Sequence, residues 1–219
     1  HVLDYTFLPS YSDREEEREA GVKNVLDTLR RHQLDSDFSR LIEIKTGYIR
    51  TTEDMQGAYS LGAVLDQIEQ LPESEEKDGL LNRLGYETYP HLISLSGYNE
   101  LLEAAGLEKL ELAQGEAAVY MDREYTSDGQ RQILNEILAE RPQTQLDGEP
   151  LYLTQEVQTA SLVTDRSITL AFALILPDEA FEYYTQNRYE IYLNGILDDS
   201  AVQEEGLMRA IVRMNERLD

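Results

Sequence analysis

The sequence predicts an α+β fold in which mixed or antiparallel sheet elements are interspersed with helices. Segments with hydrophobic residues at helical spacing alternate along the chain with shorter segments that are typical of strands. Some of these strands are joined by tight turns as hairpins, which favours α+β over a purely parallel α/β sheet. The 219 residues are 41% hydrophobic and 28% charged, a globular composition. A chain of this length buries roughly 70% of its unfolded surface, enough for one sizeable core.

The first third of the chain is expected to form a helix, a strand and a second helix. Residues 13–33 are predicted as a helix capped by Ser12, because acidic residues fill the first turn and basic residues the last. The hydrophobic face of this helix comprises Val22, Val25, Leu26 and Leu29. Residues 40–50 alternate as a strand does, and residues 56–70 have helical spacing. The acidic stretch 71–78, which contains a proline, is predicted as a loop or insertion point.

The middle of the chain is expected to contain three short strands and a helix. Residues 92–95 are predicted as a strand that follows a proline, and Ser96 then begins a helix. Gly106 is a natural C-terminal stop for this helix. Residues 109–112 and 116–121 are predicted as two strands joined by a Gln-Gly turn.

A capping box and a hairpin turn are the clearest local signals. Ser127 is followed three positions later by Gln, which predicts a helix that runs to about Glu140. Asp147-Gly148 is a strong hairpin turn, and we expect it to join strands over residues 143–146 and 151–157.

The last quarter of the chain is expected to add two strands and two helices. Residues 168–176 are predicted as a buried strand, residues 178–186 as a helix after a proline, and residues 189–193 as a further strand. Ser200 with Gln203 forms a second capping box. The final helix then presents a hydrophobic face made of Leu207, Ile211, Met214 and Leu218.

The charge of the chain excludes several kinds of partner. Nineteen basic and 43 acidic residues give a formal net charge of −24, which disfavours nucleic acid and anionic lipid surfaces. Such acidity favours cationic partners. More commonly, however, an acidic surface serves only to keep a protein soluble. The longest apolar stretch, Ile168 to Leu176, is interrupted by Thr169 and is far shorter than the about 20 residues of a spanning helix.

No catalytic, cofactor-binding or metal site is predicted. There is no cysteine, which excludes thiol catalysis and disulfides, and no phosphate-binding glycine motif. Ser96 is interpreted as a helix start rather than a nucleophile. The three histidines, His1, His32 and His91, are far apart and are expected to have structural roles. The acidic residues of 73–78 are interpreted as a solvated loop in preference to a calcium site. No carboxylate pair can be singled out for acid–base catalysis.

Four tyrosines lie close together in one short segment near the C-terminal end of the chain. The sequence has 14 tyrosines and no tryptophan. Tyr183, Tyr184, Tyr189 and Tyr192 lie close together in the sequence. An aromatic pocket is one interpretation of this group, but an amphipathic core edge is the more typical one.

Two stretches resemble the extracytoplasmic domain of FtsX/MacB-type ABC transporter permeases. Residues 89–106, followed by 110–120, are similar to the family's strand-to-helix step "ISLSDYN" and the loop and strand after it. Residues 173–182 resemble the "VVPDEDF" step near the end of the same domain, and the predicted hairpin falls between the two. Gly97 stands where the family often has Asp.

The resemblance implies a noncatalytic domain on the extracellular side of a cell membrane. A separate cytoplasmic ABC subunit would hydrolyse ATP, and the domain would couple this hydrolysis to export, sensing or release of a peptide, lipid or partner protein. A cationic antimicrobial peptide would suit the acidic surface, and its binding would be sensitive to salt. The chain begins with His1, and we expect it to be a single domain, 1–219, excised from a permease. The absence of cysteine and the acidity favour a Gram-positive surface.

Three points stay open at this stage. The fold forms either one lobe or two, with an inserted lobe that starts after about residue 51. The alternative function is a free-standing exported or cell-surface binding module, and the sequence flanking residues 1 and 219 would distinguish it from a permease loop. A hydrolase with an unrecognised carboxylate pair is a third and weaker hypothesis.

Overall fold

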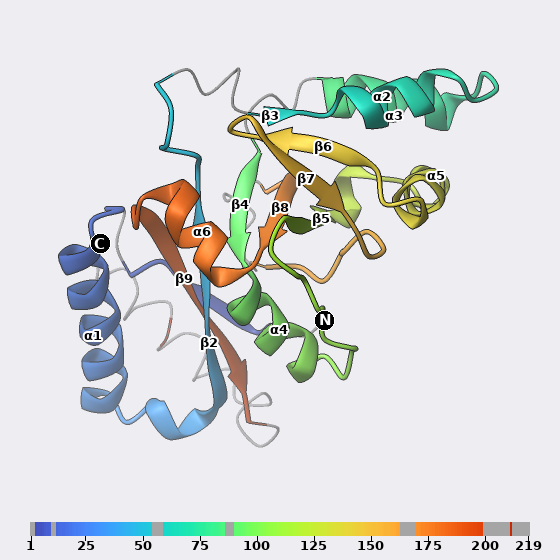
Figure 1. The fold of residues 1–219 in the computed structure, drawn as a ribbon. Coiled ribbons are helices and arrows are strands. Elements are labelled where there is room, and N and C mark those ends of the chain that lie inside the picture. Colours follow the sequence, from blue (N-terminus) through green and yellow to red (C-terminus); the bar gives the residue numbers. More distant parts are fainter. Residues whose placement is uncertain are drawn as a thin grey trace.

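The computed structural model describes residues 3–9, 12–53, 59–85, 90–162 and 170–198, together with Ile211. Within this part of the chain, six α-helices are interspersed with nine strands, and the strands form one mixed sheet (Figure 1). The α+β class predicted from the sequence is therefore confirmed.

The elements have the following bounds. The strands are β1 (Tyr5–Phe7), β2 (Phe38–Gly47), β3 (Tyr59–Ser60), β4 (His91–Ser94), β5 (Glu116–Met121), β6 (Gln143–Leu146), β7 (Glu149–Leu153), β8 (Phe172–Leu176) and β9 (Tyr189–Leu197). The helices are α1 (Glu15–Arg31), α2 (Gly62–Glu69), α3 (Glu75–Gly85), α4 (Leu95–Ala104), α5 (Asp128–Ala139) and α6 (Asp178–Thr185).

The sheet is mostly antiparallel but has two parallel pairs near its middle. The strand order is β1-β9-β2-β4-β8-β5-β7-β6-β3. β4 runs parallel to β8, and β5 runs parallel to β7, while all other neighbours are antiparallel. The parallel pair β4–β8 brings together two strands that are far apart in the sequence, and each of them leads directly into a helix.

Alternating side chains of the central strands divide the core between the two faces of the sheet. On β8, Leu174 points into one core cluster together with residues of α2, α3, α5 and α6. Its neighbour Ile175 points into the other cluster together with residues of α4. The two helices that follow the parallel strands therefore pack on opposite faces, α6 on the first and α4 on the second. Both faces being covered explains why all five residues of β8 are buried.

A third cluster lies under α1 at the β1–β9 edge of the sheet. Val25 and Leu29 of α1 pack there with Phe7 of β1 and Leu193 of β9. Ile211 is helical and fully buried in the same cluster. The predicted hydrophobic face of the first helix is confirmed for Val25 and Leu29.

The strongest local predictions are confirmed. Ser127 caps α5, since its Oγ accepts a hydrogen bond from the Gln130 amide at 3.1 Å and its own amide donates to Gln130 Oε1 at 3.0 Å. The Asp147-Gly148 hairpin joins β6 and β7, and both turn residues have the positive φ, 54° and 79°, that such a turn requires.

Several predicted boundaries in the first half were wrong. Arg14 rather than Ser12 is the residue before α1, and the Ser12 hydroxyl instead accepts a hydrogen bond from the Arg14 amide. The predicted helix 56–70 begins only at Gly62, because Tyr59 and Ser60 pair with β6. Residues 54–58 lie outside the described part.

The acidic stretch predicted as a loop forms the connection and first turn of a helix hairpin. Glu75 begins α3, so only the start of the stretch 71–78 is a loop. Lys77 is buried, and its Nζ donates to the carbonyl oxygens of Glu69 and Leu71 at the end of α2 and to Glu73. These bonds tie α3 to the C-terminus of α2, where carbonyl groups lack helical partners.

Three strand predictions in the second half also required correction. Residues 109–112 form no strand, and Leu110 is held instead by the side chain of Asn99. The strand predicted over 151–157 ends at Leu153, because Gln155 has a left-handed φ of 69°. The strand predicted to end at Leu193 extends to Leu197 and passes through a buried asparagine, Asn194.

Other predictions lie partly or wholly outside the described residues. These are the capping box at Ser200 and Gln203, the terminal helix apart from Ile211, and the first residues of the strand predicted over 168–176. The division into one or two lobes stays a prediction. In the described ranges, no helix combines the length and apolarity that a bilayer crossing demands.

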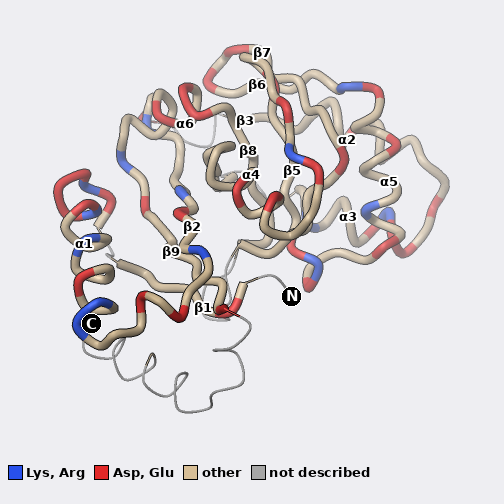
Figure 2. The backbone as a smooth tube through the Cα atoms, turned by 90° about the horizontal axis from the view of Figure 1, so that it is seen from below, with Lys and Arg blue, Asp and Glu red and all other residues tan. Residues whose placement is uncertain are grey.

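Acidic residues are spread over the molecule rather than gathered in one segment. Figure 2 shows Asp and Glu positions on α1, on the β6–β7 hairpin and on the helices at the far end of the sheet. This distribution is that of a solvated surface, so net charge alone does not locate a site.

Candidate functional site

The candidate site lies where β4 and β8 end. These strands are in parallel register, with Ser94 opposite Leu176, and each continues without a loop into α4 or α6. Because the two helices turn to opposite faces of the sheet, a crevice opens between their first turns. In open sheets with helices on both faces, ligands characteristically bind outside the carboxyl ends of parallel strands at such a point.

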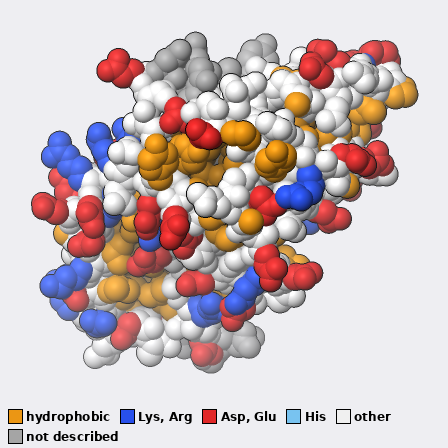
Figure 3. Space-filling model, viewed as in Figure 1, with side chains coloured by type: hydrophobic (Ala, Val, Ile, Leu, Met, Phe, Trp, Pro, Cys, Tyr) orange, Lys and Arg blue, Asp and Glu red, His pale blue; other side chains and the backbone are white. Residues whose placement is uncertain are grey.

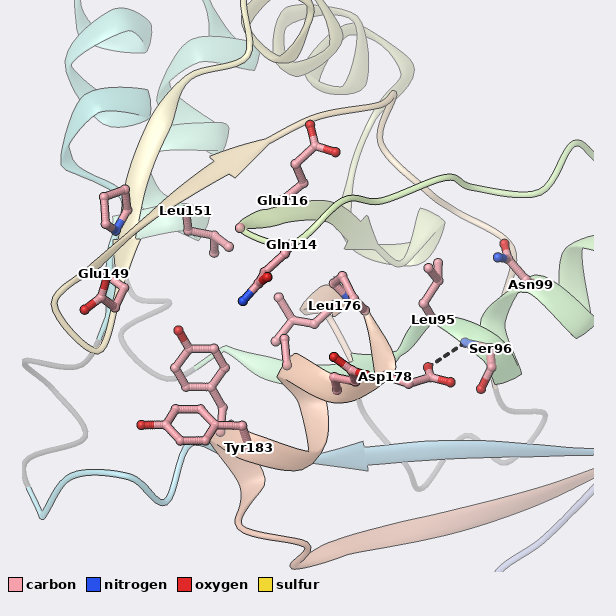
Figure 4. A pocket seen from close by; sticks show the side chains of 16 residues that line it. Leu95, Ser96, Asn99, Gln114, Glu116, Glu149, Leu151, Leu176, Asp178 and Tyr183 are labelled. Atoms are coloured by element: carbon pink, nitrogen blue, oxygen red, sulfur yellow. Dashed lines mark hydrogen bonds between the residues drawn. The ribbon is translucent and has the colours of Figure 1, made fainter.

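A single carboxylate joins the two strand ends. Asp178, the first residue of α6, accepts a hydrogen bond from the Ser94 hydroxyl at 2.5 Å and from the Ser96 amide at 3.0 Å. The carboxylate thus caps the N-terminus of α4 from a position 82 residues away from Ser96 in the sequence. Figure 4 shows this contact at one end of the groove.

The capping contact favours the ionised form of Asp178. Partial burial disfavours the charge, but the hydrogen bonds from Ser94 and Ser96, together with the charge of Lys45, outweigh this effect. The pKa of Asp178 is therefore held below its ordinary value. Asp178 is a structural carboxylate, since its Oδ1 already accepts hydrogen bonds from the Ser94 hydroxyl and the Ser96 amide.

The residues after Ser96 also have structural roles. A Cβ atom on Gly97 would lie 2.3 Å from the Glu43 carbonyl oxygen, so only glycine lets α4 pack this closely on β2. Tyr98 is fully buried against Tyr120, and burial raises its pKa. Asn99 donates to the Leu110 carbonyl and accepts from the Leu110 amide, at 3.0 and 2.8 Å. The glycine at position 97 thus has a packing reason in this chain.

Between α4, α6 and the β6–β7 hairpin lies a groove of about 960 Å³. Figure 4 shows Glu149 on the hairpin and Tyr183 on α6 at one side of the groove, with Gln114 projecting into the groove beside them. Figure 3 shows hydrophobic side chains gathered over this region, with acidic side chains along its edge. The lining residues with apolar side chains are Leu95, Pro150, Leu151, Leu176, Pro177, Ala180, Tyr183 and Tyr184.

The charged residues among the described lining of the groove are all acidic. They are Glu116, Glu149, Asp178 and Glu179. Glu116 forms an ion pair with Arg141 and accepts a hydrogen bond from the Ala113 amide, so it is engaged like Asp178. The contacts described for this part of the chain include no hydrogen bond or ion pair of the Glu149 or Glu179 side chain. These two carboxylates are therefore the ones available to a ligand.

Two tyrosines form one end of the groove. The rings of Tyr183 and Tyr184 pack edge to face with centroids 5.2 Å apart, and Tyr183 is 60% exposed. Burial, followed by the charges of Asp147 and Glu149, raises the pKa of Tyr184. The charges of Asp147 and Glu149 make the potential at this end of the groove more negative.

A second, polar cavity of about 400 Å³ lies at the start of α1. Asp13 accepts hydrogen bonds from Arg50 at 2.5 Å and from Arg188 at 3.2 Å. Partial burial disfavours its charge, but the two arginines outweigh this effect and hold the pKa of Asp13 below its ordinary value. Arg18 is buried beneath this cluster and lies over the Tyr189 ring. The cluster is an internally compensated anchor for α1 rather than an open binding site.

The histidines do not form a site in the part of the chain that is described. His91 lies against the Tyr48 ring, with centroids 4.3 Å apart, and burial lowers its pKa to about 4. His32 is the exposed residue after α1, and His1 lies outside the described ranges. Among the described residues, no three or more His, Cys, Asp and Glu side chains form a group that could hold a metal ion.

The comparisons with known proteins give no family for this chain. A scan against models of protein families finds no match, and a search of curated proteins finds no similar sequence.

The groove itself was not predicted from the sequence. The sequence grouped four tyrosines, but only Tyr183 and Tyr184 line the groove. Tyr189 and Tyr192 are buried elsewhere. Glu149 and Glu179 were indistinguishable from the other acidic residues. The signal that could have found them is their position, one after a hairpin turn and one in the first turn of a helix that follows a buried strand.

Proposed function

We propose that this chain is the noncatalytic extracellular domain of an ABC transporter permease of the FtsX/MacB type. In this role it couples ATP hydrolysis by a separate cytoplasmic subunit to export, sensing or release of a peptide, lipid or partner protein at the cell surface. The proposal places the domain outside a cell membrane and assigns it no catalytic residue, cofactor or nucleic-acid partner.

One observation carries the proposal. The two motifs that resemble the permease family are distant in the sequence, yet they form neighbouring strand-to-helix steps, β4–α4 and β8–α6, linked through Asp178. Chance similarities in two unrelated segments would have no reason to meet at one point of the fold. The residues of these motifs are engaged in capping and packing, which fits a domain whose shared sequence features maintain its architecture.

The groove gives this role a physical basis. Coupling requires that a ligand interact differently with the domain in the two states of the transporter. The groove is bounded by elements from distant parts of the chain, namely α4, α6 and the β6–β7 hairpin. A relative movement of these elements would change its shape and therefore the affinity for a ligand.

The complete gene provides the first test. Apolar segments of about 20 residues directly before His1 and after Asp219, beside a gene for a P-loop ATPase, are the expected result. The complete protein should then copurify with that ATPase from detergent-solubilised membranes. A signal peptide upstream and a stop codon near Asp219 would overturn the proposal and leave a free-standing binding module.

A further inference from the structure

We propose that the groove between α4, α6 and the β6–β7 hairpin binds a peptide segment in which a basic side chain is flanked by apolar ones. The inference rests on the proposed function in so far as that function includes a peptide ligand, and it names the ligand chemistry and the residues that recognise it. The groove has a volume of about 960 Å³, which is far larger than a single side chain requires.

The apolar part of the ligand is indicated by the walls. Leu95, Leu151 and Leu176 come from three different elements and line the same space (Figure 4), where Leu95 is partly exposed and the other two are buried. Tyr183 exposes 60% of its surface at one end, which is unusual for a large aromatic side chain. Covering the partly exposed Leu95 and the exposed Tyr183 with apolar side chains would remove them from water, which is the main source of favourable free energy in such contacts.

The basic part of the ligand is indicated by charge. Glu149 and Glu179 lie on opposite walls, from the hairpin and from α6, and neither has a described hydrogen bond or ion pair. No Lys, Arg or His occurs among the described lining residues. Of the basic residues that act on the lining carboxylates, Arg141 is paired with Glu116 and Lys45 acts on Asp178.

A cation between Glu149 and Glu179 would also face aromatic rings. Tyr183 lies on the same side of the groove as Glu149 (Figure 4), and the Tyr183 and Tyr184 rings pack together. A lysine or arginine placed there combines ion pairing with attraction to a ring face. The same carboxylates would repel the phosphate of a lipid headgroup, so a basic peptide fits the groove better than an anionic lipid.

The middle of the groove offers groups for a peptide backbone. The Gln114 amide projects into the space (Figure 4), and no hydrogen bond is described for it. An amide can both donate to and accept from a peptide group. Asn99 also lines the groove, but both of its amide atoms are bound to Leu110, so it contributes shape only.

Calorimetric titration of the 219-residue chain with a capped octapeptide of alternating leucine and lysine tests the proposal. We expect saturable binding that weakens with added salt. The octapeptide with glutamate in place of lysine should not bind, and the one with serine in place of leucine should bind about tenfold more weakly. Free lysine amide binding as well as the leucine–lysine peptide would overturn the peptide assignment in favour of a small amine.

Paired variants distinguish the groove from the general acidity of the chain. Glu149→Gln with Glu179→Gln should weaken binding about tenfold, and Tyr183→Ala should weaken it by a similar factor. The matched control, Glu136→Gln with Glu140→Gln, removes the same charge from exposed positions at the end of α5 and should change the affinity less than about twofold. Equal weakening by both double variants, or no binding at all, would overturn the proposal. Neither result would alter the expected flanking segments or ATPase, so failure of the groove and failure of the permease role are separable.

Discussion

The two walls of the groove are constructed differently. In the wall formed by the starts of α4 and α6, the Asp178 carboxylate accepts hydrogen bonds from the Ser94 hydroxyl and the Ser96 amide, and Gly97 lets α4 lie directly on β2. In the wall formed by the β6–β7 hairpin, the Glu149 side chain is exposed and has no described hydrogen bond or ion pair. The first wall is fixed by internal contacts around Asp178, and of its carboxylates only Glu179 has no described side-chain partner, whereas the second wall presents Glu149 to the groove.

This difference separates carboxylates that proximity alone would group together. Asp178 and Glu149 line the same space, but the first is occupied by donors of the protein and the second is not. An acidic lining residue is therefore a candidate for ligand recognition only after its internal hydrogen bonds have been counted. Stability measurements can test the contrast, because a structural carboxylate affects folding and a free one does not.

The largest effect is expected for Gly97→Ala in the fixed wall. The new methyl group would meet the Glu43 carbonyl oxygen at 2.3 Å, which forces α4 away from β2. We expect a loss of about 3 kcal/mol in the free energy of unfolding, which exceeds the about 1 kcal/mol that alanine gains over glycine in a helix. Urea denaturation followed by circular dichroism measures it.

Gly85→Ala is the matched control for this substitution. Among the described residues, no atom outside the neighbouring helix backbone lies within 4 Å of a Cβ at Gly85, the last residue of α3, so a neutral effect or a gain of up to about 1 kcal/mol is expected. If Gly97→Ala were as stable as the wild type, the close packing of α4 on β2 would be refuted.

Asp178→Ala should have the next largest effect. It leaves the buried Ser94 hydroxyl and the amide at the start of α4 without their acceptor, at a cost of about 2 kcal/mol. Glu179→Ala removes an acidic group from the same first turn of α6 but breaks no described contact, so its cost should stay near 0.5 kcal/mol, roughly the helix-dipole term. Thermal or urea unfolding of both variants gives the comparison, and equal losses would mean that only the helix dipole matters.

The contribution of Asp178 should also depend on pH in a defined direction. Its folded pKa is lower than its unfolded value of about 3.9, so the ionised carboxylate stabilises the fold above that pH. This stabilisation is lost as the pH falls through the folded pKa. The stability difference between wild type and Asp178→Asn, expected near 1 kcal/mol at pH 7, should therefore shrink below about pH 4. Urea titrations at pH 7, 5 and 3 measure it, and a difference that grows in acid would contradict the assignment.

What could be predicted from the sequence depended on how local the determining contacts are. The Ser127 capping box and the Asp147-Gly148 turn require only residues a few positions apart, and both predictions are confirmed. The predicted strand 109–112 was wrong because its alternating pattern says nothing about pairing, and Leu110 is held by the side chain of Asn99. Alternation is necessary for a half-buried strand, but a neighbouring strand must also be available.

The groove depends on contacts that no local pattern contains. It exists because β4 and β8 pair in parallel and send their helices to opposite faces, and the two strands are separated by several other elements in the chain. Periodicity predicted both strands and both helices, but it could not predict that they are neighbours. For the same reason, the positions of Glu149 and Glu179 after a turn and in a helix's first turn could not show that these two, among 43 acidic residues, share one space. Their significance follows from a shared space and from the lack of described partners.

The smallest effect is expected for Glu149→Gln in the exposed wall, and its sign is informative. The side chain has no described hydrogen bond to lose, and the substitution reduces the repulsion in a chain of net charge −24. The variant should therefore be as stable as the wild type or more stable by up to about 0.5 kcal/mol at low ionic strength. Because the gain comes from screened charge repulsion, it should vanish in about 1 M salt. Glu136→Gln, on the exposed face of α5, should behave in the same way under both conditions. A loss above about 1 kcal/mol for Glu149→Gln alone would show that this carboxylate supports the hairpin, and the contrast between the two walls would then be wrong.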